Sequence, residues 1–168
     1  MSFAKIYTRG LLGLHAPLIE VEVHVSQGLP SLTIVGLPEA AVRESKDRVR
    51  SAIINSGFQF PTKRLTINLA PADLPKDGSR LDLPIALGIL IASGQIPENI
   101  TDNLEFIGEL ALDGQLRPIT GILSIAIACQ QLGHQLILPE QNAEQASQLP
   151  HFEVFAAKNL KDVCDHLS

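Results

Sequence analysis

A run of ten apolar residues at 83–92 constrains the fold of this 168-residue chain more than any other feature. The run is about half as long as the roughly 20 residues that a membrane-crossing helix requires, so we interpret it as a core helix. Such a helix is apolar on every side and must be covered by other elements on every side. Asp82 is expected to cap the helix, and Pro84 suits its first turn. The run therefore predicts a helix inside one globular core.

The patterns around this run predict the other elements. Residues 18–25 alternate between apolar and polar side chains, which is typical of a half-exposed strand. Asp113 and Gly114 are a strong signal for a tight hairpin between strands at 104–112 and 115–119. Further strands are expected at 2–8, 31–35, 64–69, 135–138 and 152–155, and helices at 39–55, 121–132, 141–148 and 159–167. This order predicts an α/β fold, an α+β sandwich in which helices pack mainly against one side of a mixed sheet, as a single domain over 1–168.

Composition and cysteine usage indicate a cytoplasmic protein. The chain is 45% hydrophobic and 18% charged, and its length allows roughly two-thirds of the unfolded surface to be buried without a disulfide. Cys129 and Cys164 both lie in expected helices and form no CxxC pair, which favours a reduced chain. The first residues do not follow the pattern of a signal peptide. We expect no membrane contact.

The charge is unevenly distributed. The formal net charge of −5 argues against a nucleic-acid partner, but residues 43–80 hold eight basic against four acidic side chains, a local charge of +4. A solvated helix face with internal ion pairs is the alternative explanation. If nucleic acid binds here, we expect salt-dependent contacts to phosphates, because only Phe58 and Phe60 are near for base stacking. The candidate residues are Arg43, Lys46, Arg48, Arg50, Lys63, Arg64, Lys76 and Arg80.

Motifs for cofactors are missing from the sequence. There is no GxxxxGK[ST] loop and no GxGxxG after a strand, so we expect no nucleotide site in this chain. The five histidines are scattered without the spacing of metal ligands, so we expect no metal. Ser79 is the one serine in a suggestive context for a nucleophile, but a hydroxyl that orders the start of the next helix is the more frequent role of such a serine.

Three long stretches together resemble one family. Residues 36–61 read GLPEAAVRESKDRVRSAIINSGFQFP, residues 65–90 read LTINLAPADLPKDGSRLDLPIALGIL, and residues 108–123 read GELALDGQLRPITGIL. In this order they resemble the N-terminal domain of the ComM/YifB family of magnesium-chelatase-like AAA+ ATPases. The resemblance implies a Lon-protease-like fold, shared with a ribosomal small-subunit protein, with a left-handed βαβ crossover. It also implies an AAA+ module, which would bind ATP and magnesium, and a C-terminal domain, both absent from this chain.

The same resemblance allows a test of Lon-type chemistry. Lon-type peptidases use a serine in an Asp-Gly-Pro-Ser turn and a lysine on the helix after a Gly-Glu hairpin. Here the place of the serine falls on Arg80, with Ser79 one position early, and the place of the lysine falls at about Ile125. A serine without a nearby base is a poor nucleophile, and Lys76 is expected to be a solvent-open, protonated loop lysine. We therefore expect the architecture of Lon without its catalysis.

The leading functional hypothesis is an accessory or scaffold domain, itself not an enzyme, of a ComM-like motor. The family role is DNA helicase and branch-migration activity during natural transformation and recombination. The implied partners are the AAA+ module, neighbouring subunits of a hexameric ring, and DNA. One alternative is a Ser/Lys peptidase that uses Ser79 and Lys76, and another is a magnesium-chelatase-type subunit acting on a porphyrin.

Overall fold

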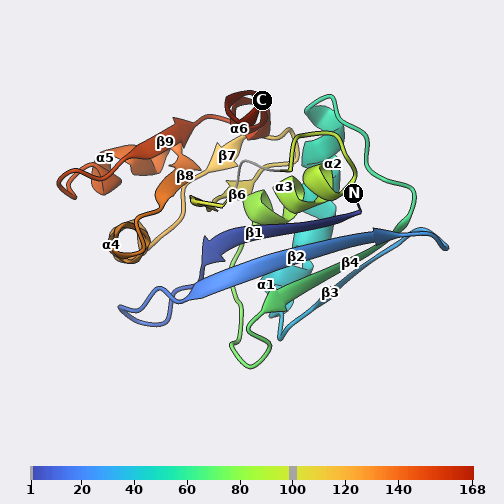
Figure 1. Cartoon of the computed structure of the whole chain (residues 1–168), viewed down its shortest axis with the longest axis horizontal. Coiled ribbons are helices and arrows are strands. Elements are labelled where there is room, and N and C mark those ends of the chain that lie inside the picture. Colours follow the sequence, from blue (N-terminus) through green and yellow to red (C-terminus); the bar gives the residue numbers. More distant parts are fainter. Residues whose placement is uncertain (1, 99–101) are drawn as a thin grey trace.

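The structure, a computed structural model, describes residues 2–98 and 102–168 and is built on one mixed sheet (Figure 1). Seven strands follow the order β3-β4-β2-β1-β5-β8-β9, and β6 and β7 form a separate hairpin. The strands are β1 (Phe3–Arg9), β2 (Leu18–Ser26), β3 (Ser31–Val35), β4 (Arg64–Ala70), β5 (Leu104–Phe106), β6 (Glu109–Leu110), β7 (Leu116–Arg117), β8 (Gln135–Pro139) and β9 (Val154–Ala157). The helices are α1 (Ala40–Arg43), α2 (Ser45–Asn55), α3 (Asp82–Ala92), α4 (Ile122–Gln131), the 3-10 turn η1 (Glu140–Asn142), α5 (Ala143–Ala146) and α6 (Leu160–Leu167).

The predicted core helix is confirmed as α3, all of whose residues are buried. It packs against β1 and β2 on one side and against α2 on the other (Figure 1). The approach to the sheet is close, because a Cβ added to Gly88 would lie 2.5 Å from Cγ2 of Val23. The predicted cap is wrong: Leu81 is the N-cap residue, no side chain caps this end, and Asp82 is already inside the helix.

One face of the N-terminal half of the sheet carries the core. In β2 the alternation is confirmed, since Val21 and Val23 are fully buried while His24 is exposed. β2 pairs antiparallel with both β1 and β4, and β3 lies parallel to β4 at the end of the sheet. α1 and α2 connect β3 to its parallel neighbour β4, and the left-handed crossover that the resemblance implies stays a prediction. The mixed sheet with helices mainly on one side is confirmed.

The C-terminal half of the sheet is covered on both faces. Leu136 and Leu138 of β8 pack with α4 and α5 in a second apolar cluster. Ile137, which points the other way, belongs to the main core together with Val163 of α6. No helix in the described ranges is long and apolar enough to cross a bilayer. Within the described residues, helices thus lie on both faces of the sheet only around β8, both of whose faces are apolar.

Several predicted boundaries change. The strand predicted at 104–112 is divided at Gly108, whose amide donates to the Arg80 carbonyl while its carbonyl accepts the Leu83 amide. These bonds separate β5, which stays in the main sheet, from β6, which pairs with β7 around the predicted Asp113–Gly114 turn. The helix predicted at 39–55 is broken at Glu44. The helix predicted at 141–148 ends at Ala146, and the strand predicted at 152–155 begins at Val154.

Candidate functional site

The two segments that correspond to the Lon-type dyad meet in the structure. The loop before α3 carries Ser79 and Arg80, and the Arg80 guanidinium donates to the Thr120 carbonyl at 3.0 Å and to its hydroxyl at 3.4 Å. Thr120 lies just before α4, on which Ile125 is fully buried among apolar neighbours. Burial lowers the pKa of Arg80. The loop that carries Ser79 and Arg80 therefore contacts the segment that leads into α4.

Lys76 differs from its prediction. We expected a loop lysine open to solvent, yet Lys76 is only 2% exposed, so this expectation was wrong. Its ammonium donates to the carbonyls of Gly36, at 2.7 Å, and Pro71. Burial lowers its pKa, and the charge of Asp73 opposes this shift. The lysine joins the loop after β3 to the loop after β4, and its described hydrogen bonds do not reach Ser79.

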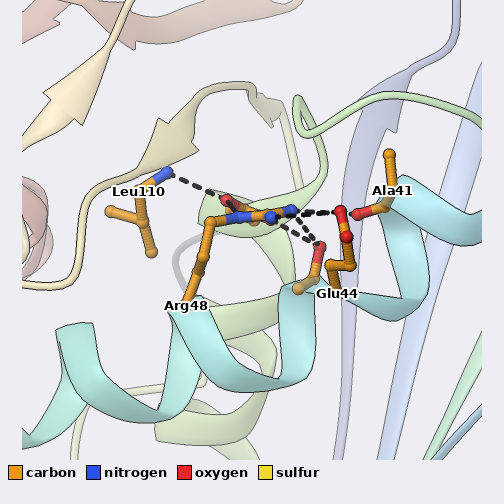
Figure 2. Close-up of polar contacts among 6 residues, drawn as sticks. Ala41, Glu44, Arg48 and Leu110 are labelled. Atoms are coloured by element: carbon orange, nitrogen blue, oxygen red, sulfur yellow. Dashed lines mark hydrogen bonds and ion pairs between the residues drawn. The ribbon is translucent and has the colours of Figure 1, made fainter.

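A buried carboxylate organises the contact between α2 and α3. Asp82 accepts bonds from the Arg48 guanidinium at 2.7 and 3.1 Å, from the Ser45 hydroxyl, and from the Leu110 amide at 3.0 Å. Figure 2 shows the Arg48 guanidinium extending from α2 to the Ala41 carbonyl, while the Leu110 amide approaches the carboxylate from the other side. Burial raises the pKa of Asp82 against these hydrogen bonds, while the carboxylate raises the pKa of Arg48.

The same network explains the break in the helix predicted at 39–55. In an unbroken helix the Ala41 carbonyl would accept the Ser45 amide. Instead it accepts Nη2 of Arg48 at 2.9 Å, and Glu44 forms a turn between α1 and α2 (Figure 2). The sequence offered one signal for this site: a carboxylate at the start of an all-apolar helix needs a buried cation as partner. That partner comes from a helix more than thirty residues away.

Three of the eight basic candidates are therefore engaged inside the molecule. Arg48, Lys76 and Arg80 all hold internal acceptors. The remaining five, Arg43, Lys46, Arg50, Lys63 and Arg64, lie at or near the surface of α1, α2 and the start of β4.

Some of these basic side chains line a groove of about 260 Å³. Lys46 and Arg50 line it from successive turns of α2, and Lys63 lines it from the segment before β4. The Arg50 guanidinium lies 5.3 Å from the centre of the Phe60 ring, which fixes the cation beside an aromatic wall. Asp47 also lines the groove and reduces its positive charge. The arrangement can offer three cations to an anionic chain.

The described residues hold no group of three His, Cys, Asp or Glu side chains placed to bind a metal ion. Cys129 and Cys164 are free and buried, and burial raises the pKa of both thiols.

The chain belongs to the family of the ChlI subunit of Mg-chelatase, whose sequence pattern matches residues 21–142. It is 49% identical to competence protein ComM of Haemophilus influenzae over 168 residues, all of this chain and 33% of that protein. It is 50% identical to the uncharacterized protein YifB of Escherichia coli over 167 residues, 99% of this chain and 33% of that protein. The chain thus spans about a third of the length of these relatives.

A more distant similarity reaches the Lon proteases. The chain is 27% identical to Lon protease 2 of Bacillus subtilis over 165 residues, covering 89% of this chain and 29% of that protease.

Proposed function

We propose that this domain is a non-catalytic accessory domain of a ComM-like AAA+ DNA motor and that its basic groove contacts DNA phosphates. ATP and magnesium would act in a separate AAA+ module, and the domain would contribute to subunit packing in a hexameric ring. The observation that carries the DNA contact is the convergence of Lys46, Arg50 and Lys63 on one groove. The chain is 49–50% identical to ComM and YifB over 99–100% of its length, and this similarity supports the proposal that it belongs to a ComM-like motor.

The groove suits a phosphate backbone better than bases. Its cations come from two turns of one helix and a neighbouring segment, and only Phe60 provides an aromatic face. Contacts between lysine or arginine and phosphate carry affinity without reading sequence. Binding should therefore be salt-dependent and indifferent to base sequence.

Fluorescence anisotropy with a labelled duplex tests this proposal. At about 50 mM salt we expect measurable binding, and three phosphate contacts give a slope of log affinity against log salt of roughly −2 to −3. The Lys46→Glu/Arg50→Glu variant should lose most of this affinity. The Lys5→Glu/Lys158→Glu variant makes the same charge change at exposed positions outside the groove and should retain more of it. Equal losses in both variants, or no binding by the unmodified chain, would leave only the scaffold role.

Family membership supports a second candidate, a chelatase-type subunit that acts on a porphyrin. An absorbance titration with a tetrapyrrole separates it from the DNA proposal, because only the chelatase-type role requires the domain to bind a macrocycle. A flat titration would count against the chelatase-type role.

A further inference from the structure

A second and larger hollow adjoins the basic groove. This large hollow has a volume of about 1050 Å³ and lies where the ends of β2, α2 and α3 meet the segment 58–63 that leads into β4. Residues 60–63 line both hollows, so the two adjoin along this segment. A flexible chain bound along the basic groove can therefore extend into the large hollow.

Two aromatic rings form part of the wall of the large hollow. Phe58 and Phe60 are each half-buried, because they pack against the main core and also line the hollow. Between them, the Gln59 amide donates to Oε1 of Gln95 at 2.9 Å, and the Gln59 carbonyl accepts Nε2 of Gln95 at 2.8 Å. These two bonds fix the segment that carries the rings. Aromatic faces held in place before binding favour the stacking of flat ligands.

The rest of the wall is polar without being acidic. Amide and hydroxyl side chains line it, among them Gln27, Gln59, Ser26 and Thr62. Within the described part of the chain no carboxylate lines the large hollow, and its titratable side chains are Lys63 and His24. Such a wall does not repel an anionic chain, and its amides and hydroxyls can hydrogen-bond the edges of a heterocycle.

We propose that the large hollow takes unpaired bases of a single DNA strand whose phosphates lie on Lys46, Arg50 and Lys63. This inference rests on the proposed contact between the basic groove and DNA. The adjoining hollows select the occupant, because a ligand that fills both must carry anions and flat uncharged groups side by side along one chain. The bases of a duplex are paired and stacked inside the helix, so only a single-stranded region can supply them. Stacking on Phe58 and Phe60 is open to every base, so the strand is held without its sequence being read.

A strand without bases tests the inference on the unmodified chain. Fluorescence anisotropy at about 50 mM salt compares a labelled oligothymidylate of about 12 nucleotides with an abasic strand of the same length. The abasic strand keeps the phosphates and lacks the bases. We expect it to bind at least about fivefold more weakly, which corresponds to the loss of one stacked base. Both strands should lose affinity in the Lys46→Glu/Arg50→Glu variant.

A substitution in the wall locates the base contact. Phe58→Leu keeps an apolar side chain against the core and removes one aromatic face. It should weaken binding of the oligothymidylate about fivefold and leave the binding of the abasic strand and the salt dependence unchanged. Phe152→Leu is the matched control, because Phe152 is a half-buried phenylalanine that packs against the second apolar cluster and lines neither hollow. Circular dichroism checks that both variants are folded.

The outcomes separate this inference from the proposed function. Equal binding of the two strands by the unmodified chain, with both lost in Lys46→Glu/Arg50→Glu, would overturn the base contact and leave the phosphate contact standing. Failure of both strands to bind would overturn the proposed DNA contact and, with it, this inference. Equal effects of Phe58→Leu and Phe152→Leu would overturn the assignment of the bases to the large hollow.

Discussion

Lys76 is unusual for a lysine, because its ammonium group is buried between two backbone carbonyls. Its pKa is lowered, so between that value and the ordinary 10.5 the folded chain binds fewer protons than the unfolded chain. Stability then increases as pH rises through this interval. Relative to Lys76→Met, the unmodified chain should gain free energy of unfolding between neutral pH and about pH 10.5, the ordinary value of a lysine. Urea unfolding at both values measures this, and Lys158→Met at an exposed lysine controls for the lost charge. A constant difference between the two proteins would contradict the prediction.

Ser79 is the residue on which the peptidase alternative depends. The described hydrogen bonds of Lys76 go to Gly36 and Pro71, so no base is shown acting on the serine hydroxyl. We expect the unmodified chain and Ser79→Ala to cleave an unfolded protein equally, at background level. Gel electrophoresis of the products measures this. If the unmodified chain cleaved the protein and Ser79→Ala did not, the result would support the peptidase alternative.

Among the elements, α3 depends on its close approach to β2. A methyl group at Gly88 would meet Val23, a buried β-branched residue whose side chain has little freedom to move. Gly88→Ala should therefore destabilise the chain by about 1–3 kcal/mol, although alanine favours helices more than glycine does. Thermal or urea unfolding measures the change. Gly10→Ala is the control, because there the methyl meets the flexible end of Ile19 at 3.2 Å and makes an ordinary contact with Pro17 at 3.8 Å. A smaller loss at Gly88 than at Gly10 would show that α3 can move away from the sheet.

At the scale of the whole molecule, the two halves of the sheet meet where β1 lies parallel to β5. A buried ion pair reinforces this seam: Arg9 donates to both oxygens of Glu105, at 2.8 and 2.9 Å, and Nδ1 of His134 lies 2.8 Å from the same carboxylate. Removing one partner of such a pair leaves an uncompensated buried charge. The seam therefore depends on Arg9.

Arg9→Ala should lower the free energy of unfolding by about 3–5 kcal/mol. Denaturant titration measures the loss. Lys161→Ala removes one partner of the exposed pair with Asp165, at 2.7 Å, and should change stability little, since solvent screens that pair. Similar effects of the two substitutions would mean that the seam is held by packing alone.

The sequence by itself determined the features that depend on neighbouring residues. The ten apolar residues at 83–92 required a covered helix, the alternation at 18–25 required a half-buried strand, and Asp113–Gly114 required a turn. Each follows from periodicity or turn chemistry within a few residues. The Lon-like sandwich came from the resemblance of long stretches, not from these patterns.

Only the tertiary structure decided which polar side chains meet. Asp82 looked like a helix cap and holds Arg48 and Ser45 instead, and the loop lysine Lys76 is buried. The basic segment therefore divides into cations that hold the fold together and cations at the surface. The physical reason is that burial and pairing of a charge depend on groups distant in sequence, whose approach is fixed only when the apolar faces have packed.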